Sequence, residues 1–427
     1  MRNISTLTIY AATILTLMGC SDGGADAPPS PSTSDVPVSN SDTGTPSDTG
    51  SIADTGSDTL GSHADAQRAV LAQLANNVIL ATYTEFETAA ESLKAAAKAN
   101  ADAPSEANAT ALHEAWDAAM VVWQRAESMQ LGPAAMKGDA IGGQDMRDGI
   151  YSWPLTSTCR IDQETAEGTY EDPAALFDEG VNVVGLDALE YVMTRTDDEN
   201  TCKPASTLNI SGAWKAVQAE IPARRAAYAS TVADLIHEKA VLLANAWKSD
   251  GGNFAGELAT AGKESKSFST AQDGLNAISD AMFFVDTVVK DMKLAVPVGL
   301  SDCKIDVCPG KLESKYRNRS KEHIANNLRG IQHLFLGGSP EENGSGFDDL
   351  MFASGATDLA NDMTDRIAKA ITAVEAIEGS MKDALTNDPD SVVAAYNAVK
   401  AFTDLFKTDF MGVLDLEVPQ RAASDND

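Results

Sequence analysis

The sequence predicts an all-α fold, and three observations support this prediction. Only 6% of the residues are aromatic, whereas strands are enriched in aromatic and β-branched side chains. Alanine, which has the highest helix propensity, is plentiful. Apolar residues recur every three or four positions along most of the chain, as on one face of a helix. At 427 residues the chain exceeds one ordinary hydrophobic core, so we expect two packed helical units with appendages.

The first element is an export signal at residues 1–19. An apolar stretch that ends at Met18 is too short to span a membrane and is typical of a secretory signal peptide. Leu17-Met18-Gly19-Cys20 resembles the lipobox of bacterial lipoproteins. The resemblance implies that Cys20 is lipid-modified and anchors the protein in the cell envelope, at the outer membrane or on its periplasmic face. The alternative is an export signal that is uncleaved or is cleaved elsewhere.

Residues 20–62 consist mainly of Ser, Thr, Asp, Pro and Gly, with almost no large apolar side chains. Such a segment cannot bury enough apolar surface to form a core, so we predict a disordered tether that begins with the lipidated cysteine. Three Asp-Thr-Gly triplets in it match the short motif of aspartic proteases. That chemistry requires two rigidly held loops, and we assign the triplets no catalytic role.

Two helices are predicted next, over residues 64–100 and 112–126. Both segments carry apolar residues at steps of three and four, and Pro104-Ser105 separates them. In the second segment Trp116 and Trp123 lie on the apolar face, which is typical of packing in a helix bundle. Gly132-Pro133 ends this region.

The most apolar run after the export signal, residues 181–193, contains two acids. Asp187 and Glu190 are three positions apart, which places them on one face of a helix beside core-facing residues. A carboxylate there is costly unless it is paired, hydrogen-bonded or bound to a cation. Gly185 weakens the helix and allows another backbone or a ligand to come close. The simpler alternative is that both acids point to solvent from a half-buried helix.

The remaining elements are predicted to form a second unit. A polar connection at residues 197–204 indicates a boundary near residue 205, which divides the folded part into residues 63–205 and 206–427. Beyond the boundary, helical patterns cover residues 214–247, 271–294, 324–335, 348–385 and 391–414.

The charge balance narrows the range of partners. Acidic residues outnumber basic ones by 63 to 32, and the formal net charge is −31. Nucleic acid is therefore not an expected partner, because its binding depends on neutralising phosphates with Lys and Arg. A negative field instead concentrates cations, and it also keeps a protein soluble.

Four cysteines remain when Cys20 is set aside, an even number in an exported protein. Disulfides are then the default, and the sequence permits three pairings. We favour Cys159 with Cys202, which closes a loop around the acidic helix, and Cys303 with Cys308, which holds a loop between two prolines. A metal site built from these cysteines is the weaker alternative, because their spacing contains no C-x-x-C pair.

Four blocks of the chain, in the same order, resemble the imelysin family. The family's signature is glycine, any residue, histidine, two residues and glutamate, and it matches Gly185 to Glu190 with Asp187 in place of the histidine. The second block is the Trp-rich helix that leads through Arg125 and Glu127 into Gly132-Pro133, and the third is Ser152-Trp153-Pro154. The fourth opens a later helix and matches at Glu313, Ser314, Tyr316, Ser320 and Asn327.

The resemblance implies an all-helical fold of two four-helix-bundle-like halves, with the functional site in the cleft between them. It also implies a cell-envelope protein linked to iron acquisition. The family was first described as peptidases, so peptidase activity is implied only by the resemblance.

The resemblance also implies a set of site residues. Asp187, Glu190 and Glu127 are the candidate metal ligands, and aspartate in place of histidine leaves only oxygen donors on this helix. Oxygen donors suit ferric iron, calcium or magnesium better than zinc or copper. Helix capping is the alternative role for Ser320, and core packing is the alternative for the tryptophans. The candidate ligand-binding residues are Gly185, Arg125, Trp153, Ser314, Tyr316, Ser320 and Asn327.

Three functional hypotheses follow. The first is an envelope lipoprotein that holds a metal ion or a small iron-containing ligand and cooperates with envelope iron-uptake proteins. The second is a metallopeptidase, for which a hydrolytic zinc normally has three protein ligands. The sequence contains no H-E-x-x-H motif, and its five histidines are dispersed. The third is a non-catalytic surface interaction module whose site has decayed with the loss of the motif histidine.

Overall fold

The computed structural model describes residues 56–419. The predicted signal peptide, Cys20 and the tether as far as residue 55 lie outside the described residues. These described residues pack as one compact unit. Every regular element described is helical, and within the described residues the strand-like contact is a single isolated bridge between Lys137 and Ala140. The predicted all-α fold is confirmed.

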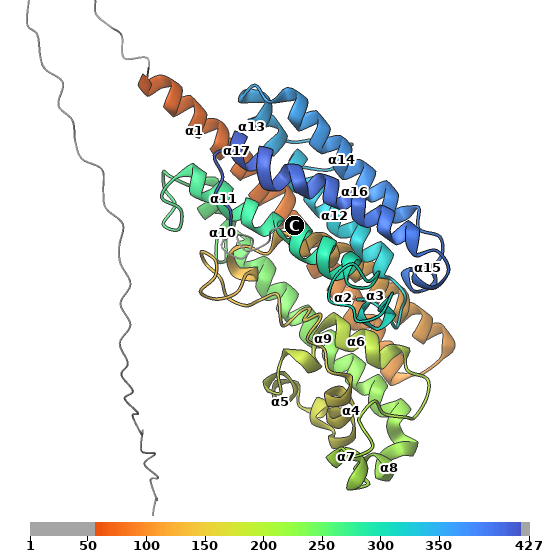
Figure 1. Ribbon diagram of the computed structural model, residues 1–427. Coiled ribbons are helices and arrows are strands. Elements are labelled where there is room, and N and C mark those ends of the chain that lie inside the picture. Colours follow the sequence, from red (N-terminus) through yellow and green to blue (C-terminus); the bar gives the residue numbers. More distant parts are fainter. Residues whose placement is uncertain (1–55, 420–427) are drawn as a thin grey trace, which may run out of the picture. The chain divides into compact units, whose positions relative to one another are not determined.

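The first set of packed helices consists of α2, α3, α6 and α9 (Figure 1). One long helical stretch runs through α1 (Gly56–Gln73), the π-helical segment η1 (Leu74–Ile79) and α2 (Leu80–Asp102). The chain then reverses into α3 (Glu106–Ala126). The Ser105 hydroxyl caps the start of this helix by accepting a hydrogen bond from the Asn108 amide at 3.1 Å. Predicted helices at residues 64–100 and 112–126 correspond to these elements.

A long connection follows α3 and carries several short elements before α6. Their bounds are η2 (Glu127–Met129), η3 (Gly132–Ala134), α4 (Thr158–Glu167), η4 (Thr169–Glu171), α5 (Pro173–Asp178) and η5 (Val181–Val183). The acidic helix α6 (Gly185–Thr194) comes next, followed by α7 (Thr207–Ile210), α8 (Ala213–Val217), η6 (Gln218–Glu220) and α9 (Ile221–Trp247). Helices α4 and α5 lie beside α9 in Figure 1.

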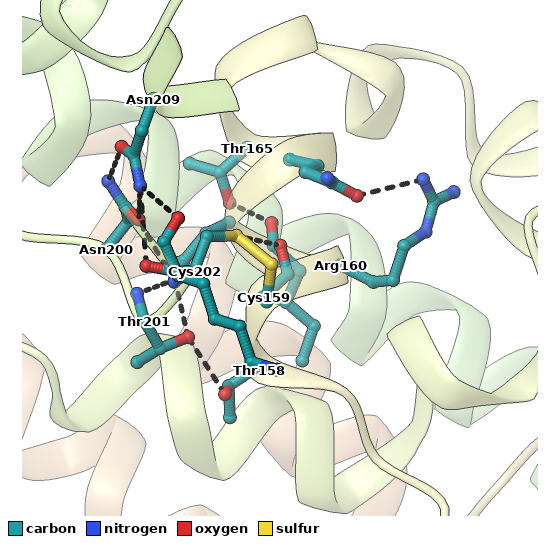
Figure 2. The surroundings of a disulfide bond; sticks show 12 residues. Thr158, Cys159, Arg160, Thr165, Asn200, Thr201, Cys202 and Asn209 are labelled. Atoms are coloured by element: carbon teal, nitrogen blue, oxygen red, sulfur yellow. Dashed lines mark hydrogen bonds between the residues drawn. A yellow bond between two sulfur atoms is a disulfide. The ribbon is translucent and has the colours of Figure 1, made fainter. Parts of the chain in front are cut away.

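The disulfide between Cys159 and Cys202 joins α4 to the segment that follows α6 (Figure 2). The two chain segments are also joined by a hydrogen bond of 2.9 Å between the hydroxyls of Thr201 and Thr158. The second disulfide joins Cys303 to Cys308. Both favoured pairings are confirmed, and the first encloses the acidic helix.

The second set of packed helices consists of η7, α12, α14 and α16. It contacts the first set mainly through α12, which lies against α3. The elements of this half are α10 (Phe254–Ala259), α11 (Ala271–Met282), the π-helix η7 (Val285–Ala295), η8 (Pro309–Lys311), α12 (Ser320–Leu336), α13 (Phe347–Ala353), α14 (Thr357–Glu375), α15 (Met381–Asn387), α16 (Pro389–Leu405), η9 (Phe406–Phe410) and α17 (Met411–Val413).

The predicted single helix at residues 348–385 is instead three helices, α13, α14 and α15. Gly355 and Gly379 break it with φ values of +80° and +67°, a left-handed conformation that favours glycine and ends helices. The Ser380 side chain then starts α15 by accepting a hydrogen bond from the Asp383 amide at 3.1 Å.

One hydrophobic core runs through both sets of helices, from Val70 to Leu416. Helix α9 lies beyond the predicted boundary near residue 205, yet it packs against α2 and α6. The division into residues 63–205 and 206–427 stays a prediction. Of the helices described, none combines the length and the apolar character that crossing a membrane requires.

Candidate functional site

Helix α6 holds the two acids of the predicted signature between α3 and α9. Asp187 is 7% exposed and Glu190 is 4% exposed, so neither side chain points to solvent. The indole nitrogen of Trp116 on α3 donates to the Leu186 carbonyl at 2.8 Å and fixes the first turn of α6. The acids therefore belong to a buried polar site, and each needs a partner.

Gly185 begins α6 at a point where two backbones come close. The Leu186 amide donates to the Ile150 carbonyl at 2.8 Å. Gly185 has a φ of +89°, and a Cβ atom there would lie 2.9 Å from the Ile150 oxygen and 3.1 Å from the Asp187 carboxylate. Only glycine fits both the conformation and the space. The expected close backbone approach at Gly185 is confirmed.

The Asp187 carboxylate has one oxygen with partners and one without. Its Oδ2 accepts hydrogen bonds from the Ser152 hydroxyl at 3.1 Å and from the Thr156 hydroxyl. Its Oδ1 is buried and has no hydrogen-bond partner among the described residues. Burial raises the Asp187 pKa to about 7, against the opposing effect of its own backbone amide and of Ser152. One carboxylate oxygen is thus left available.

Glu190 lies against the segment that leads into α12. Its Oε1 accepts hydrogen bonds from the Ser314 hydroxyl at 2.8 Å, the Tyr316 amide at 3.1 Å and the Arg317 amide at 2.7 Å. Burial, with a smaller contribution from the charge of Asp187, raises the Glu190 pKa to about 7 against the opposing effect of these hydrogen bonds. Residues 124 or more positions apart in the sequence therefore meet at this carboxylate.

A second buried polar cluster surrounds Glu313, where the first set of helices meets the second. Lys293 on η7 places its ammonium 2.7 Å from Glu313 Oε1. The same oxygen accepts from the Tyr151 hydroxyl at 2.7 Å and from the Gln124 amide at 3.0 Å. Lys293 also donates to Gln124 Oε1 at 2.9 Å and to Asn327 Oδ1 at 2.8 Å. All five side chains are buried.

The pKa shifts in this cluster reflect an ion pair removed from water. Burial alone would raise the pKa of Glu313, but the Lys293 charge outweighs it and holds that pKa well below its usual range. Burial lowers the pKa of Lys293, and Glu313 opposes this shift. His323 Nδ1 lies 3.2 Å from Glu313 Oε2, although neither atom makes a well-directed hydrogen bond among the described residues.

The structure separates the predicted site residues into groups. Asp187, Glu190, Ser314 and Tyr316 come together with Gly185 around α6, and Asn327 joins the Glu313 cluster. Glu127, Arg125, Trp153 and Ser320 take other positions.

Glu127 forms a bidentate ion pair with Arg147, at 3.1 Å to Nε and 2.7 Å to the terminal nitrogen. This pairing satisfies both of its carboxylate oxygens. The guanidinium of Arg125 pairs with Glu85 on α2 at 2.6 Å instead of entering the site.

Ser320 is buried as the first residue of α12, and the cap position belongs to Arg319, whose side chain makes no capping bond. Trp153 is half-buried beside the site, directly after Ser152. Within residues 56–419, no three His, Cys, Asp or Glu side chains gather in a way that could hold a metal ion. The three predicted metal ligands therefore do not converge.

Sequence reasoning missed Lys293, Gln124 and Tyr151 as site residues. A signal for Lys293 was present, because it continues the apolar stripe of Val285 and Val289 by one further step of four. A lysine at a core-facing position is rarely buried without a partner. Tyr151 had no comparable signal, since it lies in a loop.

We predict that Asp187 makes stability depend on pH. Its pKa is about 7 in the folded protein and near 3.9 in an unfolded chain, so the folded state binds this proton more tightly. The resulting stabilisation is complete below pH 4 and is lost as the pH rises towards 7, by up to about 3 kcal/mol between pH 5 and pH 8. Urea unfolding of the wild type and of Asp187→Asn should therefore show a stability difference that shifts in favour of the variant as the pH rises.

Asp250 is exposed in the turn that follows α9. Asp250→Asn is therefore the control variant, because it removes a carboxylate that is not buried. The prediction is wrong if the wild type and Asp187→Asn have the same pH profile.

The family model for imelysin, which is named as a peptidase family, matches residues 79–408. No curated protein is significantly similar to this chain.

Two solved structures are similar in fold. One, described as an iron-regulated protein A precursor from Parabacteroides distasonis, has 20% identity and a TM-score of 0.64, covering 82% of this chain and 94% of its own. The other, an imelysin-like protein from Psychrobacter arcticum, has 16% identity and a TM-score of 0.61, covering 83% of this chain and 97% of its own. Because the family match spans most of the chain, this protein belongs to the imelysin family.

Proposed function

We propose that this protein is an iron-linked binding protein of the cell envelope, which holds a hard cation or an iron-containing ligand at Asp187 and Glu190. The observation that carries the proposal is the buried Asp187 Oδ1 atom, which has no hydrogen-bond partner among the described residues. An unpartnered carboxylate oxygen in a buried site is costly unless a ligand, proton or cation satisfies it.

The electrostatics of α6 support a cation. Burial raises the pKa of each carboxyl to about 7, and the charge of Asp187 contributes to the shift at Glu190. A bound cation would replace the protons that these acids otherwise retain near neutral pH. The net charge of −31 favours the approach of cations.

The donor set indicates which cation fits. Both carboxylates and the nearby hydroxyls of Ser152, Thr156 and Ser314 present oxygen, and oxygen suits ferric iron, calcium or magnesium. Glu127 is occupied by Arg147, so it does not serve as a third ligand in this arrangement. The remaining coordination positions would come from water or from the oxygens of a chelator, which favours an iron-containing ligand over a bare ion.

Attachment to the envelope completes the proposal. Cys20 would carry the lipid, and residues 21–55 would connect it to the helical unit, at the outer membrane or on its periplasmic face. The solved relative described as an iron-regulated protein supports a connection with iron. Envelope iron-uptake proteins would then be the partners that deliver or receive the ligand.

The test is elemental analysis and calorimetric titration of the chain from Thr55 onward, purified without chelators. We expect about one ferric iron or other hard cation per chain after incubation with ferric citrate, calcium and magnesium. The Asp187→Asn, Glu190→Gln double variant should bind at least tenfold more weakly, because it removes both charges and leaves the hydrogen-bonding shape.

A matched control is Asp362→Asn, Asp365→Asn on α14, which removes two acids at the same spacing outside the site. It should bind as the wild type does. Absence of any bound cation in the wild type, or equal binding by the double variant, would overturn the proposal.

A further inference from the structure

The two buried polar clusters are joined at one residue, Glu313. Its side chain pairs with Lys293 and accepts a hydrogen bond from the Tyr151 hydroxyl. Its backbone leads directly into Ser314, whose hydroxyl donates to the Glu190 carboxylate at 2.8 Å. Glu313 therefore belongs to one cluster through its side chain and reaches the acid site through its neighbour in the chain.

A second connection runs through Tyr151 to the other acid. Tyr151 is 2% exposed, and its hydroxyl donates to Glu313 Oε1 at 2.7 Å. The next residue, Ser152, donates its hydroxyl to Asp187 Oδ2 at 3.1 Å. The residue before Tyr151 is bonded through its carbonyl to the first turn of α6. Residues 150–152 thus hold both α6 and Asp187, and Glu313 is the side chain to which their tyrosine is bonded.

Glu313 is suited to this role because its own position is fixed. Three donors meet at its Oε1 atom: the Lys293 ammonium at 2.7 Å, the Gln124 amide at 3.0 Å and the Tyr151 hydroxyl. The Glu313 side chain is 1% exposed, and hydrogen bonds are stronger in such an interior than in water. A carboxylate held from η7, α3 and the loop before α4 is a rigid reference point for the groups bonded to it.

Ligand-binding carboxylates depend on contacts of this kind. In metal sites, mutation of the groups that orient the ligands typically lowers metal affinity by about 10–100-fold, because functional side chains must be held within about 0.5 Å of the productive geometry. The acid site has the corresponding arrangement. Each of its carboxylates accepts a hydrogen bond from a serine that directly follows Tyr151 or Glu313 in the chain.

We propose that Glu313 and Tyr151 are positioning residues for the acid site. They fix the two serine hydroxyls that orient its carboxylates, without contacting the ligand. Because Lys293 anchors Glu313 from η7, the affinity of the acid site depends on the packing of the second set of helices against the first. The role in cation affinity rests on the proposed function, whereas the energetic coupling of Tyr151 to Asp187 does not.

The test variant is Tyr151→Phe, which removes the hydroxyl and keeps the ring. Glu313 retains its bonds to Lys293 and Gln124, so the variant should fold. In calorimetric titrations with ferric citrate and with calcium, it should bind at least about tenfold more weakly than the wild type. The path to Asp187 is the sharper one to test, because the segment that holds Glu190 has a further anchor in the pair of Arg317 with Asp117.

Tyr83→Phe is the matched control. Tyr83 is 1% exposed, and its hydroxyl donates to the Met129 carbonyl at 2.6 Å, a bond that involves neither cluster. This variant loses a buried tyrosine hydroxyl as Tyr151→Phe does, and it should bind cations as the wild type does. A general effect of lost stability would weaken binding in both variants, whereas a positioning role weakens it only in Tyr151→Phe.

A double-mutant cycle in the metal-free protein tests the link without any cation. Urea unfolding is measured for Tyr151→Phe, for Asp187→Asn and for the variant with both changes. Mutations at independent sites have nearly additive effects on stability. If Tyr151 positions Asp187, the unfolding constant of the double variant should differ from the additive value by at least about threefold. The same cycle with Tyr83→Phe should be additive.

The two proposals can fail separately. A wild type that binds no cation overturns the proposed function, and the cycle then decides the positioning role by itself. Additivity of Tyr151→Phe with Asp187→Asn overturns the positioning role, and so does a Tyr151→Phe variant that binds cations as tightly as the wild type.

The anchor is tested by the variant Lys293→Met, Glu313→Gln, which removes the charge pair and nearly conserves both side-chain volumes. It should also bind cations at least about tenfold more weakly than the wild type. Wild-type affinity in this variant would overturn the assignment of Glu313 as the residue that joins the two clusters.

Discussion

Replacing Lys293 with methionine is expected to lower the free energy of unfolding by about 3–5 kcal/mol. Lys293 and Glu313 are each about 1% exposed at their side chains and lie 2.7 Å apart. Removing the ammonium leaves the Glu313 charge buried without its counter-ion, and it also removes donors to Gln124 and Asn327. Methionine matches the length of the lysine stem, so little of the loss would come from packing. Urea unfolding at pH 7 measures the change.

An exposed ion pair in the same protein supplies the control. Lys369 and Asp365 lie 2.9 Å apart on α14 with side chains 70% and 67% exposed. Exposed pairs contribute about 0–1 kcal/mol because water and salt screen them, so Lys369→Met should change stability little. A second variant, Lys293→Met with Glu313→Gln, should recover part of the lost stability by removing the stranded charge. If Lys293→Met costs no more than Lys369→Met, the buried pair does not have the role assigned to it.

Removing the disulfide between Cys159 and Cys202 should be similarly costly. The two cysteines are 43 positions apart, and on the chain-entropy model a loop of this size stabilises the folded state by about 4 kcal/mol. The bridge encloses α6, and Cys202 packs with Leu208, Trp214 and Ile221 in a small satellite core. The Cys159→Ser, Cys202→Ser variant should therefore unfold at a markedly lower urea concentration and temperature than the wild type.

The other disulfide calibrates this expectation. Cys303 and Cys308 are 5 positions apart, and the same relation assigns so short a loop about 2 kcal/mol. Cys303→Ser, Cys308→Ser should cost about half as much. Equal losses from the two double variants would show that loop length is not what determines the effect, and a negligible loss from the first would contradict the prediction outright.

The sequence was sufficient for most of the fold because helix formation and amphipathic packing are encoded locally. Steps of three and four located the long helices, and the cysteine positions allowed the correct pairing to be chosen. The prediction of a single helix at residues 348–385 was wrong, and the cause was also local. Gly355 and Gly379 adopt left-handed φ values, and a glycine inside a helical pattern does not by itself reveal whether the chain continues or turns.

The candidate site was predicted only in part, for a different reason. Asp187 and Glu190 could be selected because two acids stood in an apolar run. Glu127 and Arg125 were selected by the family resemblance, yet Arg147 neutralises the first and Glu85 pairs with the second. The partner of a charged side chain is chosen by whatever the fold brings near it, and sequence spacing carries no information about that beyond a few turns of helix.

The sequence by itself determined that this chain is helical and that two acids share one face of an apolar helix, and it favoured the cysteine pairing that the structure confirms. Only the tertiary structure decided how each carboxylate is satisfied. Packing of α3, η7 and α12 brings Lys293 to Glu313, and the segment before α12 supplies three donors to Glu190. The buried Oδ1 of Asp187 has no hydrogen-bond partner in the part of the chain that the structure describes. The physical reason is that burial makes every unpaired charge costly, while the groups that can pair with it come from positions far away in the chain.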